Sequence, residues 1–140
     1  MHADRTELIQ RDAMMVPIIA ASPSFVPAWQ AFVEEWQDDP NGLPYYLLLG
    51  DLAGHIAQLI EEGAEAELQS IFQAVEDWHI NGDPYVREAA SVGLLEDLQN
   101  SNVVGEDVPA KVVPFLRPES LRWWRKVQAF WEHGTPIRDD

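Results

Sequence analysis

The chain has 140 residues, a net charge of −15 and no cysteine. Its length fits one domain, and the lack of cysteine excludes disulfides, thiol chemistry and thiolate metal sites. Its 46% hydrophobic content with six tryptophans excludes disorder as a description of the whole chain. We expect one helical domain over residues 1–140 with a frayed tail at 135–140. Because no run of about 18 apolar residues occurs, we also expect no membrane span, and a cytoplasmic location.

The first predicted helix begins at Asp4, which forms a D-x-x-E capping box with Glu7. Pro17 disfavours helix at the residue before it, so we expect this element to stop or kink near Met15. We interpret the apolar stretch Ala13–Ala21 as the end of this helix, because the acids before it cancel the positive charge that a secretion signal needs.

The next two helices are bounded by turn and capping residues. The second helix follows Ser24, its expected N-cap, and ends at the turn sequence that begins with Asp38. The third helix runs from Pro44 to Glu62, and Gly63 stops it. Since the third helix is apolar on nearly all sides in its first turns, we expect it at the centre of the domain.

The fourth predicted helix covers residues 64–81 and is stopped by Gly82. The fifth opens with Asp83 as its N-cap and Pro84 at the first helical position. Gly93 lies in the middle of this helix, where glycine costs about 1 kcal/mol relative to alanine. We therefore expect Gly93 to permit the close approach of a neighbouring helix.

Residues 101–109 are predicted to be a loop, followed by a short helical turn over Ala110–Leu116. The last helix begins near Pro118 and ends at Gly134. Its expected inner face, with Trp124 beside it, consists of Trp123, Val127, Phe130 and Trp131. No strand-like alternation occurs, and short loops make sequential helices antiparallel. The predicted fold class is all-α, a single-domain bundle of about five to six antiparallel helices.

The fifth predicted helix resembles the second helix of a HEAT repeat. That pattern is D-x-x-V-R-x-x-A-x-x-x-L, and its residues here are Asp83, Val86, Arg87, Ala90, Leu94 and Leu98. No second copy is visible at a period of about 40–47 residues. The resemblance therefore implies HEAT-like packing of one antiparallel helix pair and not a solenoid.

A second resemblance covers the middle of the chain. The stretches that carry it are Leu47–Ala53, Val75–Glu76, Gly82–Asp83 and Gly93–Asn100. They are similar to a family of uncharacterised small all-helical bacterial proteins associated with polymorphic-toxin systems. The resemblance implies an immunity protein, which binds and neutralises a cognate bacterial toxin. That family has no agreed catalytic residues to carry over.

The negative charge is concentrated in one stretch of the sequence. No Lys or Arg occurs between Arg11 and Arg87, while Asp and Glu are frequent there. Such a field repels nucleic acid and anionic lipid and attracts basic protein surfaces, so we expect a toxin with a basic surface, such as a nuclease. Plain solubility is the competing explanation. The candidate partner-binding residues are Glu34, Glu35, Asp38, Asp39, Glu61, Glu62, Glu65, Glu76, Asp77, Glu96 and Asp97.

Two carboxylate–histidine spacings raise the question of catalysis. Asp51 and His55 are separated by one helical turn, and Glu76 and His79 form the Glu-x-x-His spacing of di-iron bundles. A di-iron site needs two Glu-x-x-His motifs and the sequence has one, so we expect no metal site here. We expect instead that Asp51 orients His55 and that His79 ends an apolar stripe. Since no serine lies in a nucleophile-elbow context, we expect no enzyme, no metal and no cofactor.

Two alternatives to the immunity protein stay open. An acidic secretion chaperone or adaptor would grip an extended segment of its client and not a folded toxin domain. A metal-dependent helical-bundle enzyme would use His55, His79 and nearby carboxylates.

Overall fold

The α-helices account for most of residues 7–138, which are the residues that the computed structural model describes. They are α1 (Met15–Ala21), α2 (Val26–Trp36), α3 (Tyr45–Glu62), α4 (Glu65–Asn81), α5 (Pro84–Glu88), α6 (Glu96–Gln99), α7 (Ser101–Val104), α8 (Val108–Val112) and α9 (Pro118–His133). A π-helical segment, Ala89–Leu95, joins α5 to α6. The described chain is a single all-α bundle without a named strand, as predicted.

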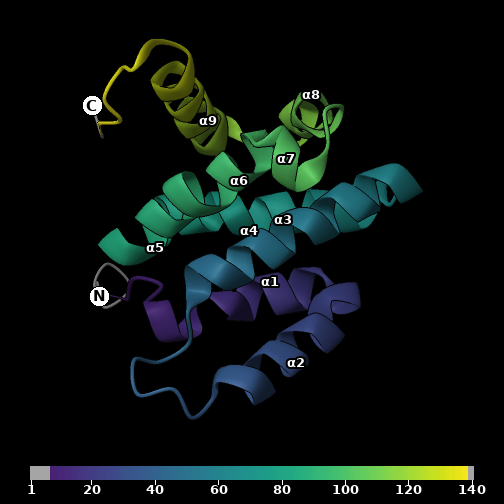
Figure 1. The fold of residues 1–140 in the computed structure, drawn as a ribbon, viewed down its shortest axis with the longest axis vertical. Coiled ribbons are helices and arrows are strands. Elements are labelled where there is room, and N and C mark those ends of the chain that lie inside the picture. Colours follow the sequence, from purple (N-terminus) through teal and green to yellow (C-terminus); the bar gives the residue numbers. More distant parts are fainter. Residues whose placement is uncertain (1–6, 139–140) are drawn as a thin grey trace.

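The helices form three layers, with α3 and α4 in the middle (Figure 1). The helices α1 and α2 lie on one side of this pair, and the chain from α7 to α9 covers the other side. Many core residues of the middle pair have no exposed surface, among them the large side chains of Leu48, Leu52, Phe72 and Trp78. The expectation that the third predicted helix lies at the centre is therefore confirmed.

Several helix ends lie where their residue types predict them. α3 ends at Gly63, whose φ of +72° is the left-handed conformation that glycine adopts without strain. Asp83 caps α5, because its Oδ1 accepts a hydrogen bond of 2.9 Å from the backbone N–H of Val86. α9 ends at Gly134, with a φ of +70°.

The fifth predicted helix is not a continuous α-helix, because its middle is the π-helical segment Ala89–Leu95. Gly93 lies in this segment and faces α3, where a Cβ atom would come within 2.8 Å of Leu49 Cδ1 and 3.4 Å of Tyr46 Cε2. The predicted close approach at Gly93 is confirmed. The π-helical turn was not predictable, since no residue type specifies it, and such turns are often found at functional sites.

The first helix begins where the prediction ended it. α1 starts at Met15, and Pro17 stands in its first turn, where a missing N–H removes no intrahelical bond. Asp4 of the expected capping box lies outside the described residues. A short 3-10 helix, Arg11–Ala13, precedes α1, and Ile9 before it forms an isolated β-bridge with Gly82 at the α4–α5 junction. The expected stop or kink at Pro17 is wrong, because Pro17 stands in the first turn of a helix, whereas the helical interpretation of Ala13–Ala21 holds from Met15 onward.

Two predicted irregular regions are more ordered than expected. The loop at residues 101–109 contains the short helix α7, which Asn100 caps by accepting a 2.9 Å hydrogen bond from the N–H of Asn102. In the expected frayed tail, residues 135–138 fold back along α9, where the backbone oxygen of Arg138 accepts a 2.6 Å hydrogen bond from Lys126 Nζ. Residues 139–140 lie outside the described part of the chain.

Candidate functional site

The predicted acidic residues do not form one continuous surface. A first group, Glu34, Glu35, Asp38 and Asp39, lies at the end of α2 and in the loop that leads to α3. A second group, Glu61, Glu62 and Glu65, lies at the α3–α4 junction. Because α3 has 18 residues, about 27 Å of helix separates the two groups (Figure 1). We call them the α2-end acids and the α3–α4 acids.

The α3–α4 acids have two neighbours that the sequence prediction omitted. Glu106 and Asp107 line the same shallow groove as Glu61, between the end of α3 and the start of α8. Both side chains are exposed, as are Glu61 and Glu62. The sequence does not predict that these two segments lie side by side, because more than forty residues of chain separate them, which is roughly the length of a helix pair.

Glu76 does not belong to the acidic surface, which corrects its assignment as a partner-binding residue. Its side chain is only 6% exposed. Its carboxylate accepts hydrogen bonds of 2.9 Å from the N–H of Glu119, 2.8 Å from the N–H of Ser120 and 2.8 Å from Ser120 Oγ. These amides belong to the first turn of α9, where N–H groups have no partner within the helix. Glu76 thus caps α9 from a neighbouring helix.

His79, the partner of Glu76 in the Glu-x-x-His spacing, is buried beneath α9. Its Nδ1 lies 3.1 Å from the oxygen of Val75 and 3.1 Å from Ser120 Oγ, and its ring stacks on Trp123 at 6.5 Å. Burial lowers the pKa of His79 to about 4, so the ring is neutral near pH 7. Within residues 7–138 no three His, Asp or Glu side chains come together as a metal site.

A polar cluster ties the α1–α2 turn to the two central helices. Ser22 Oγ donates a 2.6 Å hydrogen bond to Glu67 Oε2, and Ser24 Oγ donates to the same oxygen. Ser24 Oγ also lies 2.7 Å from His55 Nε2. Ser24 is therefore not the predicted N-cap of α2, and among the described residues it is Ser24, not Asp51, that holds His55.

This cluster lacks the order of a nucleophilic triad. In a serine hydrolase the histidine accepts the serine proton and the acid orients the histidine. Here the Ser24 proton is directed at Glu67, so Ser24 accepts a hydrogen bond from His55. These hydrogen bonds from Ser22 and Ser24 lower the pKa of Glu67. The arrangement stabilises the packing of three elements and offers no activated nucleophile.

The inner face of α9 differs from the prediction, and of the four predicted residues only Val127 is fully buried. Trp124 is 4% exposed and Val127 is fully buried, whereas Phe130 and Trp131 are exposed. The buried stripe starts at Ser120, which lies four residues before Trp124 and seven before Val127. The sequence leaves the rotation of this helix ambiguous, because a stripe through Trp123 and a stripe through the adjacent Trp124 both contain large apolar residues.

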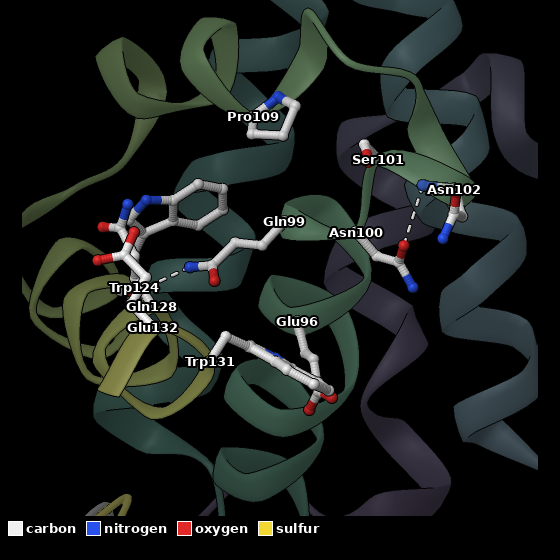
Figure 2. A pocket seen from close by; sticks show the side chains of 10 residues that line it. All are labelled: Glu96, Gln99, Asn100, Ser101, Asn102, Pro109, Trp124, Gln128, Trp131 and Glu132. Carbon is white, nitrogen blue, oxygen red and sulfur yellow. Dashed lines mark hydrogen bonds between the residues drawn. The ribbon is translucent and has the colours of Figure 1, made fainter. Parts of the chain in front are cut away.

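The face of α9 that carries Trp124 also carries Trp131, seven residues later, which lines a cleft of about 500 Å³ (Figure 2). The cleft lies between the segment from α6 to α8 and the second half of α9. Its lining combines carboxylates, amides and two indole rings: Glu96, Gln99, Asn100, Ser101, Asn102, Pro109, Trp124, Gln128, Trp131 and Glu132. Within the described chain this lining includes no Lys or Arg.

Two of the predicted acids lie at this cleft or directly beside it. Burial raises the pKa of Glu96, and no hydrogen bond or ion pair engages its carboxylate within residues 7–138. Burial, and then the charge of Glu96, raise the pKa of the neighbouring Asp97 to about 6. Gln99 Nε2 donates a 2.8 Å hydrogen bond to the backbone oxygen of Trp124 and joins the two walls (Figure 2). The negative charge here is therefore incompletely compensated.

These features define an all-helical protein with an acidic surface in two groups and one mixed cleft. The chain belongs to the family described as a domain of unknown function, DUF7674, whose model matches residues 16–132. Neither the curated proteins nor the solved structures contain a match to this chain. Within residues 7–138 no single helix is long and apolar enough to cross a membrane, although the bent pair Arg11–Ala21 and Pro23–Trp36 passes by length and composition alone.

Proposed function

We propose that this protein is an immunity protein that binds a cognate bacterial toxin through acidic side chains and blocks the toxin's substrate site. The observation that carries the proposal is the absence of any Lys or Arg between Arg11 and Arg87, in a stretch whose acids are mostly exposed. A long-range negative field speeds encounter with a basic surface and disfavours like-charged partners. Enzymes that act on phosphates present such basic surfaces, so a nuclease toxin fits this field best.

The middle of the molecule suits a broad contact of this kind. Between the α2-end acids and the α3–α4 acids, α3 presents an exposed stripe that includes Leu47, Asp51 and Gln58. These residues recur at helical spacing on one face. A stable protein interface covers roughly 800 Å² on each partner, which exceeds what either acidic group offers alone. We infer that the partner lies along α3 and that the acids surround the contact.

The experiment is a growth assay with the protein encoded by the gene adjacent to this one. That protein expressed alone is expected to arrest growth, and co-expression of the full chain is expected to restore it. The rescue is then repeated with Glu61→Lys plus Glu62→Lys and with a charge-matched control, Glu7→Lys plus Glu88→Lys, all exposed positions.

We expect association of the purified pair to slow about tenfold or more at low salt for the first variant and little for the control. Equal effects of the two variants would show that net charge alone governs association, and would contradict the assignment of the α3–α4 acids to the contact surface. If no adjacent protein is toxic or bound, the immunity role is wrong. If a complex forms, limited proteolysis distinguishes an immunity protein from a chaperone. A partner that is cleaved outside one bound segment would indicate a chaperone instead.

A further inference from the structure

The cleft beside α9 contains apolar surface that the fold does not use. Trp131 is 61% exposed, whereas Trp124, two turns earlier on the same helix, is 4% exposed. An exposed tryptophan contributes nothing to the core, yet tryptophan is the residue most enriched among side chains that anchor protein interfaces. Figure 2 shows the ring of Trp131 beside Glu96 on the α6 side of the cleft.

The polar lining of the cleft includes one half-buried carboxylate, Glu96, that no donor among the described residues engages, whereas Glu132 lies 3.7 Å from His133 Nε2. Glu96 lies on α6 and Glu132 on α9, so carboxylates line both walls. The amide nitrogen of Gln99 is already used by the backbone of Trp124, which leaves its oxygen available. Burial raises the pKa of Glu96, and a cation placed beside it would relieve this electrostatic penalty.

We propose that this cleft binds an arginine side chain of the protein partner, with the guanidinium stacked on Trp131 and bonded to the carboxylate of Glu96. The inference rests on the proposed function and specifies the chemistry by which the partner is held. Arginine fits better than lysine, because its planar guanidinium stacks on an indole and its five donors can reach carboxylate and amide oxygens together. An apolar side chain would leave the Glu96 carboxylate without a partner.

The site is tested by titrating the full chain with the peptide acetyl-Gly-Arg-Gly-amide and following the tryptophan indole N–H signals by NMR. The matched peptides carry citrulline, which keeps the shape and lacks the charge, or lysine. We expect millimolar binding that shifts the Trp131 signal, with the arginine peptide at least about fivefold tighter than the citrulline peptide. The indole of Trp29, on α2, is the internal reference for non-specific effects.

Three variants locate the interaction. Glu96→Gln is expected to weaken arginine-peptide binding about tenfold, and Trp131→Ala is expected to abolish it. Glu88→Gln is the control with equal charge loss, and all variants are first shown to be folded by urea denaturation. Equal binding of the citrulline peptide, equal effects of the control, or shifts centred on Trp29 would each overturn the arginine site.

The same variants separate this proposal from the proposed function. If Glu61→Lys with Glu62→Lys slows toxin association while the cleft variants leave toxin affinity unchanged, the immunity role stands and the arginine site is wrong. If the arginine peptide binds the cleft with the expected preference but the adjacent protein does not bind the chain, the site stands as an arginine-binding cleft and the immunity role is wrong.

Discussion

Each half of α9 carries a tryptophan and lies beside a carboxylate of another helix, but the two halves differ in burial and in hydrogen bonding. In the first half, Trp124 is buried against the core and Glu76 satisfies the free amides of the first turn. In the second half, Trp131 is exposed and Glu96 has no hydrogen-bond or ion-pair partner among the described residues. A carboxylate with three donors stabilises the fold, whereas a desolvated carboxylate without a donor weakens it. We infer that the first half holds the structure and the second half is available for binding.

The largest effect is expected from tryptophan replacements in the two halves. Trp124→Ala should lower the free energy of unfolding by about 3–5 kcal/mol, because it leaves a large cavity in the core. Trp131→Ala should change it by less than about 1 kcal/mol, since an exposed ring loses few contacts on truncation. Urea denaturation followed by circular dichroism measures both. Similar losses for the two variants would show that Trp131 is packed and would remove the distinction between the halves.

The next effect tests Glu76 as the cap of α9. Glu76→Ala should destabilise the protein by about 2–4 kcal/mol, because three donors lose their acceptor and the amide of Ser120 stays buried. Asp77→Ala is the matched control: within residues 7–138 its carboxylate accepts only a 3.3 Å hydrogen bond from Gln73, and we expect a change within about 0.5 kcal/mol. The unfolding free energies of the two variants are compared in urea. A loss below about 1 kcal/mol for Glu76→Ala would contradict the capping role.

A smaller effect is expected at Asp97, beside the cleft, and depends on pH. Burial raises the pKa of Asp97 to about 6 from 3.8, so the folded protein binds this proton more tightly than the unfolded chain does. Stability from this group is therefore greatest below about pH 4 and is lost as the pH rises through about 6. Asp97→Asn should stabilise the protein by about 1 kcal/mol at pH 8, since solvent screens this half-exposed group.

The measurement for Asp97 is the unfolding free energy of wild type and variant at pH 4, 6 and 8. Asp51→Asn, at an exposed position of α3, corrects for the change in net charge. A wild-type protein more stable than Asp97→Asn at pH 8 would show that a partner compensates the buried charge.

Features that depend on neighbouring residues in the chain could be predicted from the sequence. Gly63 and Gly134 end helices through their own backbone conformation, and Asp83 caps α5 by accepting from the N–H three residues later in the chain. The all-α class and the central position of α3 followed from hydrophobic periodicity. The concentration of negative charge is likewise a property of the sequence alone.

Features that depend on packing between distant segments could not be predicted. Glu76 faces inward because the first turn of α9 lies against α4, and nothing in its neighbours in the chain distinguishes it from Asp77. The rotation of α9 was ambiguous, because Trp123 and Trp124 are adjacent. The cleft was missed because its two walls, the segment from α6 to α8 and the second half of α9, meet only through packing.

The smallest effect is expected at Glu67, where the polar cluster holds the α1–α2 turn. Hydrogen bonds from Ser22 and Ser24 lower the pKa of Glu67 below its ordinary value of 4.5. The stability from this carboxylate is present above that value and is lost as the pH falls through the folded pKa. Glu67→Gln should therefore destabilise the protein at pH 7 by less than about 1 kcal/mol, and the difference from wild type should shrink below about pH 4.5.

Urea denaturation of wild type, Glu67→Gln and Ser24→Ala at pH 7, 5 and 3.5 tests this expectation. Ser24→Ala keeps the carboxylate and the Ser22 donor, so it should show the same pH trend with a smaller amplitude. A difference that stays constant from pH 7 to 3.5 would mean that Glu67 contributes through packing and not through its charge. The cluster at Glu67 would then resemble the first half of α9, where shape and satisfied hydrogen bonds hold the elements together.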